Sequence, residues 1–596
     1  MMTRRNWLTW LFTIIIALFG VLLLVLIFLP YGTLKTLADS LLPDHNFNSL
    51  KPWNVDVFKV LFGTSGLVFL GLAVLTSLRR WNLVGTFFKQ LWADARRFFA
   101  GLRPKKGELG FLVAVLVIMM LAVIYRLEHI YSSLHHDEAY TYVAFARSLF
   151  AAVADYHLPN NHVFHSILVY FSTKIFGIQP WAVRLPAFTA GMLLVPAAYW
   201  LAKRLYDRWT ALGAALLVAW FPPLIAYSNN ARGYTILALF TLLTLILGDF
   251  VRKEKNLFAW GLISLFSALG LYTVPVMLFP FGMLFVWLFL ENQVEGVAVS
   301  GQSNGPGPYR TKREFFWHWL AAGLGAAVLT LLFYTPILVF AGPQELFANG
   351  FVAPLPWVDL LETLSHRFAE TWAEWTFRIP LVVLLLFAAG WTLSLLFHRR
   401  LSTTRVPLQL AALLWIIVLL ILQRPDAWTK VWVFLQPLIL IWAAAGILGL
   451  LKKVHLKFAR GLSVAVIVFG LALLSGTWQA ARLVPQLPGL WAIRGDEENA
   501  VLFVQSQLQE GDLIVVAPPD DAPVWYYSEL HGIPDVRFDP RNLAFERALV
   551  LVDPVEGQTP ASVIEERGPE QSILDVESAS LLGTFGKIQV FEVPRK

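Results

Sequence analysis

The chain has 596 residues, of which 57% are hydrophobic and only 15% are charged. An ordinary soluble domain carries about 25% charged residues, so this composition excludes that class and favours a membrane protein. The net charge of +7 does not indicate a nucleic-acid partner, which would require a basic face on a folded domain. The absence of cysteine excludes disulfides and thiolate metal ligands.

Apolar runs long enough to cross a bilayer, roughly 20 residues each, recur along most of the chain. We predict about thirteen transmembrane helices, at 7–30, 57–79, 109–131, 182–202, 210–228, 234–251, 257–273, 275–290, 316–340, 380–397, 406–422, 432–451 and 461–479. The predicted fold class is therefore a polytopic α-helical membrane protein.

Lysine and arginine gather in loops that these spans place on one side of the membrane. The basic segments are 4–5, 79–106, 203–208, 252–255, 310–313, 399–405 and 452–460. The positive-inside rule makes that side cytoplasmic. We therefore expect a multi-pass protein of a bacterial cell (plasma) membrane, with residues 135–138 and the C-terminal tail outside.

A charged cluster, His135-His136-Asp137-Glu138, follows the apolar run that ends at Tyr131. Ionisable residues at a membrane boundary are costly and usually functional, and two carboxylates beside two imidazoles suit proton transfer or a metal ion. The alternative is that these charges only mark the water interface. Between Asp137 and Pro180 the apolar residues have helical spacing, which predicts amphipathic helices in the interface.

Two histidines in this outer loop, His162 and His165, are three residues apart and would share a helix face. With His136 or Asp137 they could hold a divalent metal ion. Alternatively, they hydrogen-bond substrate or loop backbone. No DxD motif lies near them, and no cofactor is certain.

After about residue 495 the apolar runs become short. Helical patterns at 500–508, 524–531 and 560–567 alternate with strand patterns at 513–517, 548–552 and 587–593, which predicts a small α/β domain. Asp520 and Asp521 at a predicted strand end either bind a ligand or cap a helix. We divide the chain into a two-helix extension with a basic loop (1–107), a membrane core (108–480) and the α/β domain (495–596).

The outer loops and helix ends contain several short motifs: Asp137-Glu-Ala-Tyr140, Asn160-Asn161-His162 with His165, Trp181-Ala-Val-Arg184-Leu-Pro186, Ala202-Lys-Arg-Leu-Tyr206, Tyr227-Ser-Asn-Asn-Ala-Arg232-Gly-Tyr234, and Lys430-Val-Trp432 before Gln436-Pro437. Together they resemble the dolichyl-phosphate-mannose protein mannosyltransferase superfamily, the C-type (GT-C) membrane glycosyltransferases, which includes lipid A aminoarabinose transferases. The resemblance covers roughly residues 109 to 478, and Lys430 stands where the family has Arg.

The resemblance implies a GT-C fold and transfer of a sugar from a polyprenyl-phosphate carrier to a glycan, lipid or protein acceptor on the outer face. It implies that Asp137 is the general base, with Glu138 as alternative or partner. The residues implied to contact substrate are Tyr140, Asn161, His162, His165, Arg184, Arg232 and Lys430.

The residue types suit this chemistry independently. A carboxylate can take the proton of an acceptor hydroxyl, and the guanidinium groups of Arg184 and Arg232 can fork onto a lipid phosphate, with Lys430 as a further point charge. The alternative for each arginine is snorkelling to the interface. For the whole chain the alternatives are a lipid or sugar transporter or flippase, which would place charges near the midplane, and a non-catalytic envelope scaffold.

Overall fold

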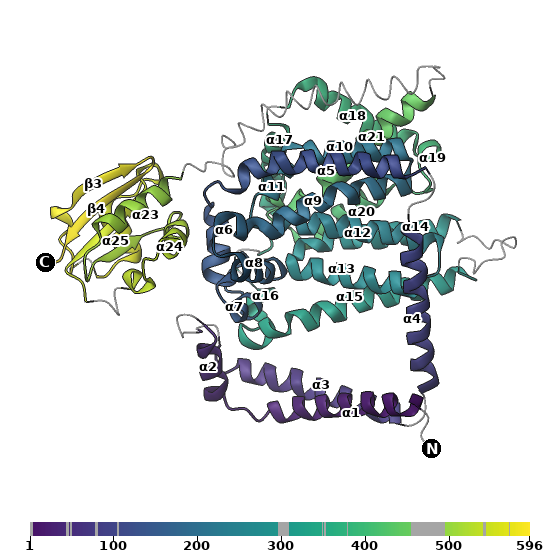
Figure 1. Ribbon diagram of the computed structural model, residues 1–596, viewed down its shortest axis with the longest axis horizontal. Coiled ribbons are helices and arrows are strands. Elements are labelled where there is room, and N and C mark those ends of the chain that lie inside the picture. Colours follow the sequence, from purple (N-terminus) through teal and green to yellow (C-terminus); the bar gives the residue numbers. More distant parts are fainter. Residues whose placement is uncertain are drawn as a thin grey trace.

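The structure, a computed structural model, describes residues 4–596 except 43–46, 48–49, 78–80, 104–106, 296–308, 349, 351–352, 378, 454–494, 540–543 and 571. A bundle of long helices forms the body of the molecule, and a small domain with a β-sheet lies beyond one end of it (Figure 1). The expected fold class, a polytopic helical membrane protein with a C-terminal α/β domain, is confirmed.

The first two long helices, α1 (Arg4–Leu26) and α3 (Asn54–Ser77), pack side by side and are linked by α2 (Tyr31–Ser40) (Figure 1). Their axes come close because glycines face each other: a Cβ atom on Gly66 would lie 2.9 Å from the carbonyl oxygen of Gly20. Asn54 attaches this pair to the bundle by donating to the carbonyl of Phe340 at 2.9 Å.

The basic segment that follows forms a helix, α4 (Trp81–Gly101), where the sequence predicted a loop. Phe88, Trp92 and Phe99 are exposed, whereas Asp94 is buried and accepts the backbone N–H of Leu257 at 2.7 Å. The segment has an amphipathic helical pattern, which its many charged residues made easy to mistake for a loop. In Figure 1, α4 runs across the ends of the bundle helices.

The bundle contains the remaining predicted spans that the structure describes. Its elements are α5 (Leu109–Ile130), α9 (Pro180–Leu205), α10 (Arg208–Trp220), α11 (Pro222–Ser228), α12 (Tyr234–Lys253), α13 (Leu257–Thr273), η2 (Pro275–Met277), α14 (Leu278–Glu295), α15 (Lys312–Phe340), α18 (Leu381–Leu396), α19 (His398–Leu401), α20 (Leu408–Gln423), η4 (Thr429–Trp432) and α21 (Leu435–Lys453). The predicted span 461–479 lies outside the described residues.

Within the described residues, six helices are long and apolar enough to cross a membrane, or up to nine if each bent helix pair is one span. One bent pair is α10 and α11, which meet at 61°. The break falls at Pro222 and Pro223, where a proline cannot continue the hydrogen bonding of the preceding turn.

The two long connections contain shorter helices. Between α5 and α9 lie α6 (His136–Tyr140), the π-helical η1 (Thr141–Ala146), α7 (Leu149–Ala154) and α8 (Val163–Phe176). Between α15 and α18 lie α16 (Pro343–Phe347) and α17 (Trp357–Thr376). The helical pattern expected for the first connection is confirmed.

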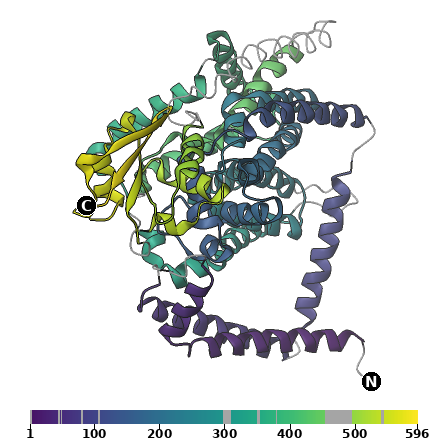
Figure 2. The ribbon, with the colours of Figure 1, turned by 60° about the vertical axis from the view of Figure 1, so that its left-hand side comes forward.

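The C-terminal domain has helices on both faces of a four-stranded sheet (Figure 2). The strands β1 (Leu513–Val516), β2 (Arg547–Val552), β3 (Ser580–Phe585) and β4 (Ile588–Pro594) have the order β1-β2-β4-β3, with β1 and β2 parallel and the other pairs antiparallel. One face packs against α23 (Asp496–Gln507) and α24 (Asp521–Leu530), the other against α25 (Pro560–Arg567). Among the strands and α-helices described in this domain, β3, which is half exposed, is the one that sequence patterns missed.

Asp520 directly precedes α24, but its carboxylate does not cap that helix; it pairs with Lys587 in the turn between β3 and β4. Neither role considered for this residue, helix cap or ligand site, describes the contact. The ion pair joins the end of β1, at one edge of the sheet, to the turn between β3 and β4 near the other edge.

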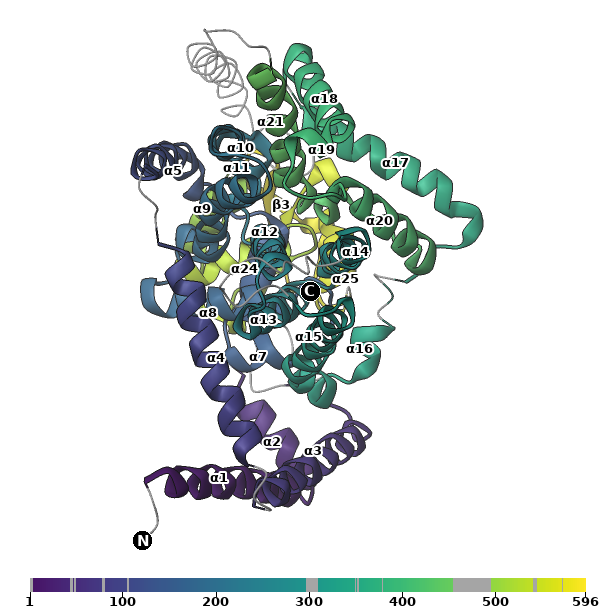
Figure 3. The same cartoon turned by 90° about the vertical axis from the view of Figure 1, so that its right-hand side faces the viewer.

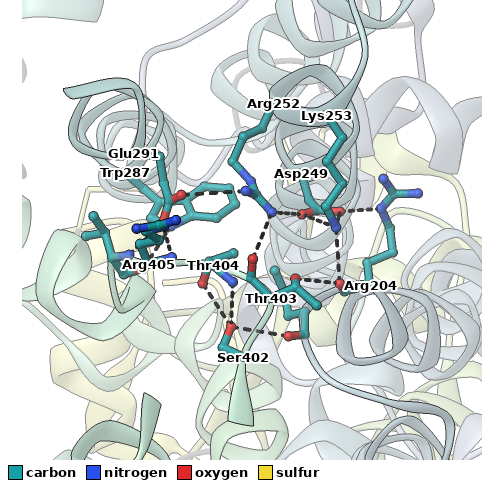
Figure 4. A network of polar contacts seen from close by, with 12 residues as sticks. Arg204, Asp249, Arg252, Lys253, Trp287, Glu291, Ser402, Thr403, Thr404 and Arg405 are labelled. Atoms are coloured by element: carbon teal, nitrogen blue, oxygen red, sulfur yellow. Dashed lines mark hydrogen bonds and ion pairs between the residues drawn. The ribbon is translucent and has the colours of Figure 1, made fainter. Parts of the chain in front are cut away.

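At the bundle end remote from α6, a polar network joins three helices to the segment between α19 and α20 (Figure 4). Asp249 is fully buried, and its carboxylate contacts Arg204, Arg252 and Lys253 at 2.8–2.9 Å. Glu291 accepts the backbone N–H groups of Arg405 and Val406. The network satisfies charges that would otherwise be buried alone, and it fixes the ends of α9, α12 and α14.

We predict that Asp249→Ala destabilises the protein by about 3 kcal/mol, because it leaves several cations close together without their carboxylate. Thermal unfolding in detergent should occur at a lower temperature than for the wild type. Glu254→Ala, a nearby carboxylate outside this network, is the control; equal stability of the two variants would contradict a structural role for the network.

Candidate active site

A buried ion pair holds the loop that follows α5. Glu138 and Arg184 are 1% and 0% exposed, and Nε and Nη2 of Arg184 donate to the two carboxylate oxygens at 2.8 Å each. The same carboxylate accepts the backbone N–H of His135 at 3.0 Å and of Ala231 at 2.7 Å. Both oxygens of Glu138 are therefore fully occupied.

Arg184 has further partners in the loop itself. Its Nη1 donates to the carbonyls of Ile130 and Ser132, and its Nη2 to the carbonyl of Ser133. A guanidinium used in this way cannot also fork onto a lipid phosphate. The phosphate-binding role expected for Arg184 therefore does not fit its contacts, which hold the loop in place.

Asp137, the residue directly before Glu138, points away from this pair and remains 34% exposed. Its Oδ2 lies 3.4 Å from Nη1 of Arg232 and 3.4 Å from Nζ of Lys430. Burial alone would raise the pKa of Asp137, but Arg232 and then Lys430 outweigh it and hold this pKa well below its usual range. The site thus combines one ionised carboxylate with two cations.

His162 completes this group. Its Nδ1 accepts the backbone N–H of Gly233 at 2.8 Å, and its Nε2 lies 3.3 Å from Nη2 of Arg232. Gly233 is required for this approach, because a Cβ atom there would lie 3.0 Å from Nδ1 of His162 and 2.4 Å from Thr273. Burial, and then the charge of Arg232, lower the pKa of His162 well below its ordinary value, so the ring is neutral.

His165 is fully buried, and neither ring nitrogen has a hydrogen-bond partner among the described residues. Burial, and then Arg232, lower its pKa to about 3. His136 points elsewhere: its Nδ1 donates to the carbonyl of Pro519 at 2.7 Å. Over the part of the chain that the structure describes, no group of three or more His, Asp or Glu side chains is arranged to hold a metal ion.

Two other residues expected to contact substrate have partners within the loop. Asn161 donates to the carbonyls of Ala152 and Asp155 and so joins α7 to α8. The hydroxyl of Tyr140 bonds Nε2 of His157 at 2.9 Å. Among the described residues, neither side chain hydrogen-bonds to Asp137.

The C-terminal domain packs directly on the loop that carries Asp137, a contact that no sequence pattern indicated. The hydroxyl of Tyr527 accepts the backbone N–H of Leu134 at 2.9 Å. Arg147, just after η1, pairs with Glu529 at 3.0 Å and with Asp535 at 2.6 Å. Apolar residues of α24 share one core with those of α6 and η1.

The family model for dolichyl-phosphate-mannose-protein mannosyltransferase matches residues 162–298 of this chain. That segment contains His162, Arg184 and Arg232, and it runs through α8 to α14. No curated protein matches the chain.

Two solved proteins are similar in structure. ArnT from Cupriavidus metallidurans in the apo state has a TM-score of 0.49 at 13% identity over 81% of this chain and 98% of that chain; bound to undecaprenyl phosphate it has a TM-score of 0.47 with the same identity and coverage. The oligosaccharyltransferase from Archaeoglobus fulgidus in the apo form has a TM-score of 0.44 at 11% identity over 75% of this chain and 70% of that chain.

The family-model match agrees with the resemblance inferred from the motifs, and it falls on the segment that supplies His162 and Arg232 of the group around Asp137. Residues 162–298 of the chain are thus similar to the dolichyl-phosphate-mannose-protein mannosyltransferase family.

Proposed function

We propose that this protein transfers a sugar from a polyprenyl-phosphate carrier to a hydroxyl of a glycan, lipid or protein acceptor. The observation that carries the proposal is the group formed by Asp137, Arg232, Lys430 and His162. The carboxylate contacts both cations, and the neutral imidazole contacts Arg232. In this proposal, residues 108–480 form the catalytic membrane unit, residues 1–107 an extension, and residues 495–596 an extracytoplasmic domain.

Arg232, Lys430 and His162 suit the carrier phosphate. Nδ1 of His162 accepts a backbone N–H, so its ring proton is on Nε2. That N–H faces an N–H of Arg232 at 3.3 Å, and two donors that face each other need a common acceptor. A phosphate oxygen supplies one, and its negative charge suits Arg232 and Lys430.

Asp137 suits the acceptor hydroxyl. The hydroxyl oxygen attacks the anomeric carbon, its proton passes to the carboxylate, and the bond from that carbon to the phosphate oxygen breaks, leaving the phosphate on the carrier. A carboxylate with a strongly lowered pKa is a weak base. The bound phosphate offsets the charges of Arg232 and Lys430, so it raises the pKa of Asp137 when the donor is present.

Glu138 and Arg184 then act as positioning residues, not as base and phosphate ligand. Their buried pair fixes the loop from Ile130 to Ser133 and, through Ala231, the segment that carries Arg232. The backbone segments that carry Asp137 and Arg232 are thereby both held by Glu138 and Arg184.

We predict that Glu138→Gln lowers stability by about 3–5 kcal/mol, because it leaves the charge of Arg184 buried without a carboxylate. Asp137→Asn is the matched control, since it alters the adjacent, partly exposed carboxylate. Thermal unfolding in detergent should separate the two variants, and a loss of activity without loss of stability in Glu138→Gln would instead support Glu138 as the base.

We predict that Asp137→Asn abolishes sugar transfer but binds undecaprenyl phosphate several-fold more tightly than the wild type, because the carboxylate no longer competes with phosphate for Arg232 and Lys430. Arg232→Ala should weaken the same binding about tenfold or more. Binding is measured by native mass spectrometry in nanodiscs, and transfer by mass spectrometry of lipid and glycan fractions from cells carrying each variant.

Normal transfer by Asp137→Asn would remove the base assignment. If Asp137→Asn loses lipid translocation and the wild type shows no detectable sugar transfer, the results would favour a flippase. Unchanged lipid binding in Arg232→Ala would remove the phosphate assignment.

We also propose that Asp137 and the C-terminal domain are extracytoplasmic, as the distribution of basic loops suggests. The chain has no cysteine, so single introduced cysteines report access without background. We predict that an impermeant thiol reagent labels Val555→Cys in intact cells and labels Arg400→Cys only after the membrane is opened. The reverse pattern would overturn the proposed orientation.

A further inference from the structure

Lys430 lies on a segment with little regular structure of its own. Helix α20 ends at Gln423, and the chain then runs without a helix to the short η4. The lysine side chain is 39% exposed, and a flexible lysine loses rotamer freedom when it is held in one place. Its 3.4 Å approach to Asp137 therefore depends on what fixes this segment.

Helix α17 supplies that anchor. Arg367 donates to both carboxylate oxygens of Asp426, from Nε at 2.6 Å and from Nη2 at 2.9 Å. Its guanidinium also lies 3.2 Å from the ring centre of Trp428. A planar guanidinium can make a two-pronged bond and stack at the same time, which lysine cannot.

One helical turn further, Thr371 donates to the hydroxyl of Thr429 at 3.3 Å, and both side chains are buried. Thr429 is the residue directly before Lys430. The helix therefore contacts Asp426, Trp428 and Thr429, all within four residues of the lysine.

Helix α17 is itself attached at both ends, and it crosses the outside of the bundle (Figure 3). At its start, Leu355 and Arg424 exchange a pair of hydrogen bonds at 2.8 and 2.9 Å. Near its end, Glu374 accepts from the hydroxyl of Tyr227 at 3.1 Å. Tyr227 belongs to α11, which leads directly into the segment that carries Arg232.

We propose that Arg367 and Thr371 are positioning residues that hold Lys430 against Asp137, so that α17 sets the spacing of Lys430 and Arg232 for one phosphate group. This inference rests on the proposed function. It assigns a role in donor binding to the connection between α15 and α18, whose described residues make no hydrogen bond or ion pair with Asp137.

The test measures binding of undecaprenyl phosphate to the full-length protein in nanodiscs. Arg367→Lys keeps the charge but loses the fork, and it should weaken binding roughly three- to thirtyfold. Lys430→Met should weaken it as well, and the double variant should bind no more weakly than Lys430→Met alone. Glu362→Gln, an exposed change on the same helix, should bind like the wild type.

Strictly additive losses, or unchanged binding in Arg367→Lys, would overturn the inference while leaving the proposed function intact. If Lys430→Met binds like the wild type, the assignment of this lysine to the phosphate fails, and the inference fails with it. Coupling between the two positions is a result that simple destabilisation of α17 would not produce.

A second measurement does not depend on Arg367. Thr371→Cys with Thr429→Cys introduces two thiols into a chain that has none, at positions whose hydroxyls touch. The oxidised, cross-linked protein should bind undecaprenyl phosphate as tightly as the reduced form, because the bond preserves the contact. Loss of binding on oxidation, restored by reductant, would show that α17 must leave this segment and would overturn the inference.

Discussion

The buried pair of Glu138 and Arg184 is the interaction on which the site depends. Two charges removed from water are costly unless each is fully hydrogen-bonded, and here every oxygen of Glu138 and three carbonyls of the loop take part. Glu138 also accepts the backbone N–H of Ala231. Through it, the end of α5, the start of α9 and the segment before α12 are joined at one point, and Asp137 and Arg232 extend from that point.

The charged group beside this pair is not balanced. Asp137 offers one negative charge to Arg232 and Lys430, and the buried His162 is neutral. One positive charge therefore remains at a position where an ionised side chain is costly. A ligand that carries negative charge would restore the balance, which is why the geometry favours a phosphate over a neutral sugar as the group that the cations hold.

Sequence patterns predicted much of this architecture but could not assign each residue. Apolar runs located the spans because their length is set by the bilayer, whereas α4 was missed because its charges were interpreted as a loop. Asp137 and Glu138 are neighbours, yet successive residues on a helix point about 100° apart. One faces the interior and one faces the site, and no local pattern distinguishes them. The partners of Arg184 could not be predicted for the same reason, since they are distant in sequence.

The contacts that sequence could not reveal are those between separate connections. Lys430 reaches Asp137 across 293 positions of the chain, and it does so because α17, from a third connection, fixes its backbone. The C-terminal domain similarly braces the Asp137 loop through Tyr527 and Arg147. Because the site is assembled from such distant segments, a substitution can alter one segment independently of the others. The motif residues Asp137, His162 and Arg232 then supply most of the polar groups of the site, while α17 and the C-terminal domain determine how firmly these groups are held.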